Sequence, residues 1–229
     1  MKPRYGLLLS LLALASAGVA RAEVKQSAAD GFLIALSAPV AATPAKVWAA
    51  LVQPQRWWSD EHTWSGKAAN LSLKAEAGAC FCERWPGGSV EHGRVVMVLP
   101  QQLLRLDAAL GPLQALALKG ALTFRIDSGD DGATTLALEY RVNGASASGL
   151  DQFAPQVDDV LDQQFARLVR FVANGNPGAP PAPPAVDTGA AHRAEIIEEW
   201  KQQMLEEQGA SAVPTKPAKP AKPARGSKP

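Results

Sequence analysis

The stretch whose residues could do chemistry is GACFCERWPGGSVEHG, residues 78–93, which holds the only two cysteines of the chain. Cys80 and Cys82 stand one residue apart, and His92 follows after a turn. Thiolates and imidazole bind zinc or copper, neighbouring thiols can form a disulfide, and buried thiols also act as small apolar side chains. The compartment of the protein and the face that the cysteines occupy decide between these chemistries.

The cysteines lie on the first strand of a predicted hairpin that turns around residues 86–89. A two- or four-residue loop pairs the two cysteines with Gly93 and Val95. This register matches apolar faces on both strands, so we expect both cysteines to face inward. A three-residue loop would instead place Cys82 opposite His92, and the matching of apolar faces favours the first register.

The same register fixes the charged residues of the hairpin. It pairs Arg84 with Glu91 across the two strands as an ion pair. It also points His92 away from the interior, opposite Glu83, so His92 cannot join the cysteines. A metal site would then need His62 to reach over from the segment SDEHTWSG. Because Cys-x-Cys is not a zinc-knuckle spacing and no second cysteine pair exists, we expect neither a metal nor a cofactor.

A disulfide between Cys80 and Cys82 and a pair of free buried thiols are both open interpretations. Alternate residues of a strand have Cα atoms about 6.6 Å apart, near the upper limit for a bridge. The bond would therefore require local bending, and it would be strained and easily reduced. An oxidising compartment would favour it.

Most of the tryptophans fall between residues 48 and 85. Trp57, Trp58 and Trp64 lie near a loop that is expected to border a cavity, and aromatic walls with a few polar groups suit a small-molecule pocket. Core packing is the alternative for each of them. The residues that we expect to contact a ligand are Trp57, Trp58, His62, Trp64, Cys80, Cys82, Arg84, Glu91 and Met97.

Motifs for catalysis are scarce. The sequence contains no Ser-His-Asp spacing, no HExxH motif and no phosphate-binding loop. His62 beside Asp60 and Glu61 could act as a general base, but one histidine near acids is weak evidence. We therefore expect no defined catalytic centre.

The first 22 residues are typical of a secretory signal peptide. They combine a basic start, an apolar run over residues 6–20 and the small residues of an Ala-Arg-Ala cleavage signature. The apolar run of about 15 residues is shorter than the roughly 20 needed to span a bilayer. We expect a mature chain that begins at Glu23, lies in the periplasm or outside the cell, and has no transmembrane segment.

The charge balance excludes nucleic acid as a partner. The chain carries 23 basic residues, three of them in the leader, against 22 acidic ones. Several of the remaining basic residues lie in the Lys-Pro-Ala repeat at the end, so the body of the protein is mildly acidic and has no basic patch. The repeat could make weak contact with an anionic envelope surface, or it could stay soluble and disordered.

The mature chain divides into segments by composition. We expect an N-terminal extension over 23–31, a single domain over 32–173, a Pro/Ala linker over 174–188, a short helix over 189–208 and a disordered tail over 209–229.

Within the domain, the pattern of apolar residues predicts a strand, two short helices, about six antiparallel strands and one long terminal helix. Thr43 caps the first helix, with Pro44 at its first position. Pro155 marks the first turn of the terminal helix, and Gly175 ends that helix. We expect an α+β fold in which a curved antiparallel sheet grips the C-terminal helix and encloses an internal cavity.

Three features of the domain resemble the SRPBCC superfamily. They are the segment APVAATPAKVWAALVQPQRWW, a Gly-rich hairpin followed by GRVVMVLPQQLLRL, and the terminal amphipathic helix. The resemblance covers residues 32–172 and implies the START-like, or helix-grip, fold. It is closest to the branch of heat-shock-protein ATPase activator-like and polyketide cyclase-like proteins. These motifs specify the fold well and the function poorly. The iron–sulfur branch needs a cluster-binding domain that this chain lacks, and an exported protein meets no cytosolic chaperone or ATP.

The function that these features favour is an exported START-like domain that binds a hydrophobic or amphipathic small molecule in its cavity. His62, Arg84 and Glu91 would orient that molecule at the mouth. One alternative is a cyclase- or hydrolase-like enzyme that uses the same cavity through His62 or a thiol. The other is an envelope interaction protein that acts through its basic tail.

Overall fold

The computed structural model describes residues 23–129, 133–178 and 202. The chain divides into two units, residues 1–182 and 183–229. The predicted signal peptide, most of the linker, the short helix and the tail lie outside the described residues, except that Gln202 is helical. None of the described helices is both long and apolar enough to span a membrane.

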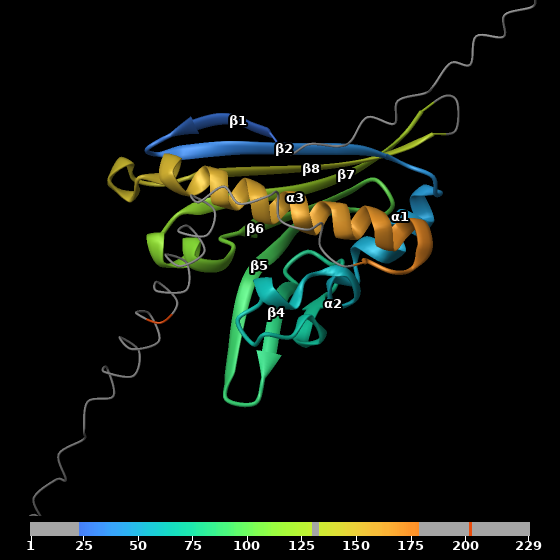
Figure 1. Cartoon of the computed structure of the whole chain (residues 1–229), viewed down its shortest axis with the longest axis horizontal. Coiled ribbons are helices and arrows are strands. Elements are labelled where there is room, and N and C mark those ends of the chain that lie inside the picture. The colour runs from blue at the N-terminus through green and yellow to red at the C-terminus, as the bar shows by residue number, and fades with distance from the viewer. Residues whose placement is uncertain (1–22, 130–132, 179–201, 203–229) are drawn as a thin grey trace, which may run out of the picture. The chain divides into compact units, whose positions relative to one another are not determined.

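A single antiparallel sheet of eight strands forms the body of the first unit (Figure 1). The strands lie side by side in the order β1-β2-β8-β7-β6-β5-β4-β3. Their bounds are β1 (Glu23–Ala28), β2 (Gly31–Val40), β3 (Leu71–Leu73), β4 (Cys80–Trp85), β5 (Gly88–Leu99), β6 (Leu103–Ala108), β7 (Lys119–Ser128) and β8 (Thr134–Asn143).

The edge strand β1 occupies residues that the sequence predicts as an extension. Its sequence, EVKQSA, has a single large apolar residue, so no alternation of apolar side chains marks it as a strand. It forms because β2 offers a free edge, to which β1 pairs in antiparallel register.

Two short helices follow β2, as the sequence predicts. In α1 (Pro44–Leu51), the side chain of Thr43 accepts a hydrogen bond from the backbone N–H of Lys46, and Pro44 takes the first helical position. The helix α2 (Pro54–Trp57) comes directly after it. The 3-10 turns are η1 (Asp60–His62), η2 (Ala68–Asn70), η3 (Gly111–Leu116) and η4 (Ser146–Ser148).

The terminal helix α3 (Leu150–Asn174) ends at Gly175, which adopts the left-handed conformation that favours glycine. It starts earlier than the position of Pro155 indicates. Pro155 lies inside the helix rather than in its first turn, so the prediction for its start is wrong. The exposed ring of Pro155 lies on the solvent side of the helix, where the lost backbone hydrogen bond is tolerated.

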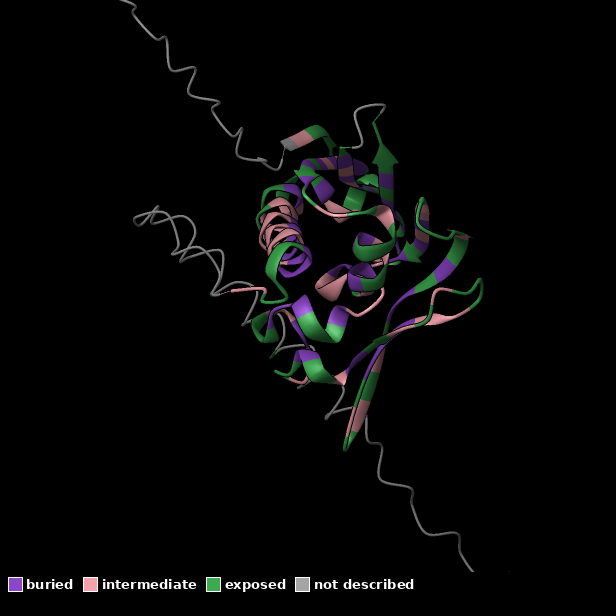
Figure 2. Ribbon diagram, turned by 90° about the vertical axis from the view of Figure 1, so that its right-hand side faces the viewer, coloured by how far each residue is buried: buried purple, intermediate pink, exposed green. Residues whose placement is uncertain are grey.

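The core lies between α3 and one face of the sheet (Figures 1 and 2). Leu161, Phe165 and Leu168 of α3 are all at most 2 % exposed. The strands present alternate residues to them, and fully buried examples are Ile34, Val95, Leu104, Leu136, Tyr140 and Val142. This is the predicted α+β, helix-grip architecture, which the strand order and α3 confirm. The internal cavity remains a prediction, because these side chains pack the space between helix and sheet.

Candidate functional site

The strands β4 and β5 join through a tight turn and contain a β-bulge. The pairing of the strands skips His92, which stands as an extra residue in β5. Cys82 therefore pairs with Glu91, and Gly93 pairs with Phe81. The predicted register, with Cys82 opposite Gly93, is wrong because the strands already pair at Trp85 and Gly88, across the tight turn of Pro86 and Gly87, and because the bulge beyond Cys82 shifts the pairing again.

The bulge inverts the predicted assignment of faces. Phe81 and Glu83 of β4 are buried, together with His92 of β5. Cys80 and Cys82 alternate with these residues along β4, so they take the opposite face. The prediction that His92 points away from the interior is therefore wrong. The cysteines lie on the face opposite Phe81, so the prediction that they line the core face is wrong as well, although Cys82 is itself buried.

Cys80 and Cys82 are joined by a disulfide. Their Cα atoms lie 5.3 Å apart, which is shorter than the about 6.6 Å of a regular strand and within the usual range for a bridge. The bend that the bond requires occurs next to the bulge. Closing so small a loop stabilises a fold by only about 1.5 kcal/mol in the chain-entropy model.

Glu91 and Arg94 flank the disulfide. A carboxylate oxygen of Glu91 and the two sulfur atoms lie within 4.8 Å of one another. Arg94 Nη2 donates to Glu91 Oε2 at 2.5 Å, and its Nη1 donates to the carbonyl of Gly78 at 2.9 Å. The predicted pairing of Arg84 with Glu91 is wrong, since Arg84 pairs with Ser89. With both sulfurs bonded to each other, the cluster offers no thiolate to a metal ion.

Met97 also lies away from the core. A second bulge in β5, between Val95 and Met97, makes Val96 an extra residue. The side chain of Met97 is 37 % exposed. The prediction that Met97 lines an internal cavity is therefore wrong, and the cause is again an inserted residue.

Glu83 is fully buried and accepts three hydrogen bonds. The backbone N–H groups of Trp64 and Ser65 donate to it at 3.1 and 2.5 Å, and His92 Nε2 lies 3.0 Å from Glu83 Oε2. Burial raises the pKa of the Glu83 carboxyl, but the hydrogen bonds from Ser65, Trp64 and His92 outweigh it and hold the pKa below its ordinary value. The charged carboxylate therefore ties the loop over residues 58–66 to the sheet.

The imidazole of His92 is neutral at pH 7. Burial lowers its pKa, and the neighbouring Glu83 only partly opposes that effect. Because the carboxylate accepts, Nε2–H of His92 is the donor and Nδ1 carries the lone pair. The ring of His92 lies 5.1 Å from the ring of Phe81, measured between centroids.

Trp57 and Trp58 are core residues. The indole N–H of Trp57 donates to the carbonyl of Ala50 at 3.1 Å, and that of Trp58 donates to the carbonyl of His62 at 2.9 Å. The centroids of the two indole rings lie 5.4 Å apart, and Trp58 lies 5.9 Å from the ring of Phe81. Trp58 thereby links α2 to the aromatic side chains of β4.

His62 and Trp64 lie half-buried in the loop over residues 58–66. His62 Nε2 is 3.1 Å from Gln163 Oε1 of α3. Of the predicted ligand-contacting residues, the structure therefore groups four on or beside this loop and places the others along β4 and β5, away from the core face. The first group is Trp57, Trp58, His62 and Trp64, and the second is Cys80, Cys82, Arg84, Glu91 and Met97.

Gln164 of α3 is a functional candidate that the sequence prediction missed. Its side chain is 1 % exposed, and its Oε1 accepts a hydrogen bond from the backbone N–H of Ser59 at 2.8 Å. That contact fixes the orientation of the amide, and Nε2 finds no acceptor among the described residues. Leaving a buried donor unpaired costs about 1–3 kcal/mol, so a group in this position calls for a partner such as a ligand or water.

A sequence signal for Gln164 was present. It follows Leu161 by three residues and precedes Leu168 by four, so it falls on the apolar stripe of α3. A glutamine at a core-facing position of an amphipathic helix is the kind of exception that marks a buried polar contact.

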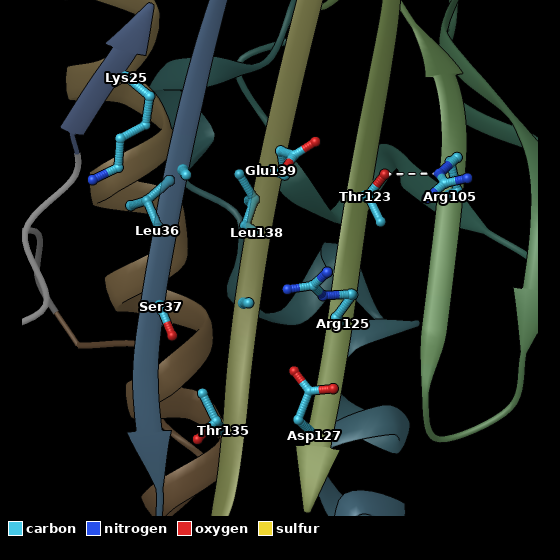
Figure 3. Close-up of a pocket in the computed structure, with 12 residues that line it drawn as sticks. Lys25, Leu36, Ser37, Arg105, Thr123, Arg125, Asp127, Thr135, Leu138 and Glu139 are labelled. Atoms are coloured by element: carbon cyan, nitrogen blue, oxygen red, sulfur yellow. Dashed lines mark hydrogen bonds between the residues drawn. The ribbon is translucent and has the colours of Figure 1, made fainter.

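A hollow of about 400 Å³ lies on the outer face of the sheet, with α3 on the far side of the strands (Figure 3). The small side chains of Ser37 and Ala137 pair across β2 and β8 in this hollow, and Arg125 of β7 pairs with Ala137 on its other side. Arg105, also in its lining, donates from Nε to the hydroxyl of Thr123 at 3.0 Å. The charged and hydroxyl groups of this hollow distinguish it from the apolar cavity that the sequence predicts.

No family model and no curated protein matches the chain. Solved structures resemble it. A conserved protein of unknown function from Enterococcus faecalis has 11 % identity and a TM-score of 0.49, over 83 % of this chain and 91 % of its own. CalU16 from Micromonospora echinospora has 17 % identity and a TM-score of 0.46, over 76 % and 86 %. DynU16, from the dynemicin biosynthetic locus, has 19 % identity and a TM-score of 0.43, over 63 % of this chain and 48 % of its own.

At these identities, the likeness concerns the fold alone. The helix-grip architecture follows from the order of the eight strands and the position of α3. Membership of the SRPBCC superfamily stays a prediction from the residues that resemble it.

Proposed function

We propose that the protein is a binding module for a hydrophobic or amphipathic small molecule, which it holds between α3 and the sheet. The observation that carries this proposal is the unpartnered Nε2 donor of Gln164 on the apolar face of α3. A hydrogen-bond acceptor on the ligand would give this donor its missing partner. The further proposal that the domain is exported rests on the leader sequence.

The surroundings of Gln164 favour a neutral acceptor over an anionic one. The loop over residues 58–66 contacts Gln164 through Ser59 and contacts Glu83 through Trp64 and Ser65. Glu83 is already a buried charge, and a second anion in the same interior would add repulsion at low dielectric. A carbonyl oxygen on an otherwise apolar molecule suits this chemistry.

Entry of such a molecule requires the loop over residues 58–66 to move. The loop is held by hydrogen bonds that its backbone N–H groups donate to Gln164 and Glu83. Two further contacts come from α3, where Gln163 meets His62 and Arg167 donates to the carbonyl of Trp58. Burial of about 300 Å² of apolar ligand surface contributes roughly 7 kcal/mol. Association and the opening of the loop offset several of these kilocalories, and micromolar binding needs about 8 kcal/mol net, so apolar burial alone gives only weak affinity.

The experiment is a fluorescence titration of the full chain with Nile red, a neutral dye that carries a carbonyl acceptor. Gln164→Glu keeps an acceptor for the Ser59 N–H and removes the Nε2 donor. We expect it to weaken Nile red binding about tenfold, the effect of losing one hydrogen bond. Gln164→Met, which removes the donor without adding a charge, should weaken binding to a similar extent.

The matched control is Gln152→Glu, the same chemical change at an exposed position of α3. We expect its affinity for Nile red to equal that of the wild type. Equal affinities for the wild type and both Gln164 variants, each folded by circular dichroism, would contradict the proposal.

The alternative of a cyclase- or hydrolase-like enzyme that uses a free cavity thiol has no support in this structure, since the described cysteines are bridged. The alternative of an envelope interaction protein depends on residues 209–229, which lie outside the described part of the chain.

A further inference from the structure

The Cys80–Cys82 disulfide does little to hold the fold. It joins residues two positions apart on one strand. β4 is already held on both sides, where Ser72 of β3 pairs with Cys82 and Arg94 of β5 pairs with Cys80. A bond within one paired strand closes almost no loop in the unfolded chain, so stabilisation does not account for it.

The two sulfur positions differ in access. Cys80 is half-buried, whereas Cys82 is 5 % exposed. An incoming thiolate therefore reaches the sulfur of Cys80 more easily, which makes Cys82 the leaving group. This asymmetry between an accessible and a protected sulfur is what directional thiol–disulfide exchange needs.

Charged groups at the disulfide complete a reactive environment. Glu91 brings a carboxylate oxygen to within 4.8 Å of the sulfurs, where it can accept the proton of an approaching thiol. Arg94 holds that carboxylate through Nη2 and places its guanidinium on the same side of the strand. A neighbouring cation stabilises a thiolate.

We propose that Cys80–Cys82 is a redox-active disulfide that oxidises a dithiol on an exposed polypeptide segment. Glu91 takes the proton from the first substrate thiol. The resulting thiolate attacks Sγ of Cys80, a new sulfur–sulfur bond forms, and the electron pair of the broken bond goes to Sγ of Cys82, which is then protonated. The second substrate thiolate attacks the substrate sulfur of this mixed disulfide and expels Cys80. The substrate dithiol is oxidised by two electrons, both cysteines are reduced, and a small-molecule disulfide reoxidises them by the reverse exchange.

The edge of β5 beside Cys80 points to a polypeptide as the substrate. The pairing of β4 with β5 ends where Cys80 faces Arg94. Just before β4, Gly78 and Ala79 form two more backbone hydrogen bonds with Val95. Beyond that point β5 pairs with β6 on its other side, and the described residues leave the edge next to β4 without a strand partner. Val96, Met97 and Leu99 are large apolar residues exposed in this segment. An extended chain with apolar side chains can pair with such an edge.

The test is a turnover assay with the full chain, a reduced synthetic peptide that carries two cysteines, and oxidised glutathione at pH 7. Acid quenching and mass spectrometry measure the peptide disulfide. We expect the protein to accelerate its formation at least about tenfold over glutathione alone, and to show a transient mixed disulfide with the peptide at Cys80. Cys80→Ser and Cys82→Ser should both return the rate to the glutathione background.

Glu91→Gln tests the proton transfer. We expect its rate to fall about tenfold at an unchanged thermal unfolding midpoint, with Glu139→Gln, an exposed carboxylate elsewhere on the sheet, as the matched control at the wild-type rate. A wild-type rate equal to glutathione alone, or a disulfide that stays intact in excess peptide dithiol, overturns the proposal. An unchanged rate in Glu91→Gln overturns the role assigned to Glu91.

Discussion

Glu83 and Gln164 show two states of a buried polar side chain in one interior. Glu83 has three hydrogen-bond donors and keeps its charge. Gln164 uses one end of its amide and leaves the other without an acceptor among the described residues. We infer from this contrast that Glu83 holds the loop over residues 58–66 in place and that Gln164 is available to a ligand.

The role of Glu83 predicts how the stability of the protein depends on pH. Because folding lowers the pKa of Glu83, its contribution is present above the ordinary carboxyl pKa of 4.5 and is lost as the pH falls through the lower, folded value. We expect Glu83→Gln to lower the free energy of unfolding at pH 7 by about 2 kcal/mol, and the difference from the wild type to shrink as the pH falls below 4.5. Urea unfolding at pH 7, 5 and 3.5 measures it.

The control for this prediction is Glu139→Gln, which removes an exposed carboxylate from the outer face of the sheet. Its unfolding free energy should stay within about 0.5 kcal/mol of the wild type at every pH. A Glu83→Gln variant as stable as the wild type at pH 7 would show that Glu83 does not hold the loop.

The pairing of residues in the hairpin was only partly predictable. The sequence suggested that His92 lies opposite Glu83, and the two side chains are in contact. The sequence also predicted that both side chains lie on the solvent face, and that prediction is wrong because both are buried. A β-bulge shifts one strand by one residue and exchanges its faces. The apolar pattern around Gly93 does not indicate that His92 is an extra residue.

At the scale of elements, α3 carries a proline where a helix loses a hydrogen bond. Pro155 is the sixth residue of the helix, so its missing N–H cannot donate to the carbonyl of Asp151. In the described α-helices, the other prolines are Pro44 of α1 and Pro54 of α2, which stand at helix starts, where no such bond is lost.

Replacement of Pro155 therefore should stabilise the protein. We expect Pro155→Ala to raise the free energy of unfolding by about 1–2 kcal/mol, since the regained hydrogen bond and relieved contact outweigh the greater freedom of the unfolded chain. Pro44→Ala, the matched control, should lower it by up to about 1 kcal/mol. Denaturation midpoints in urea compare the variants, and a destabilised Pro155→Ala would mean that α3 depends on the bend at this position.

The whole molecule shows which level of structure the sequence determines most clearly. Strong signals gave the order of the elements: the cap at Thr43, the apolar stripe of α3 and the stop at Gly175. The edge strand β1 was not predicted, because a strand at the edge of a sheet needs little alternation of apolar and polar residues. The site was harder to predict, because the faces of β4 and β5 depend on two bulges, and because Gln164 was hidden among the apolar residues around it.

The most direct test of a ligand held between α3 and the sheet is a two-dimensional NMR titration of the ¹⁵N-labelled protein with Nile red. The account predicts that the largest shifts occur at the Gln164 side-chain amide, the Ser59 backbone N–H and the Trp58 indole N–H. Shifts confined to Thr123, Arg125 and Ala137, which line the hollow on the outer face, with the three interior signals unmoved, would contradict it.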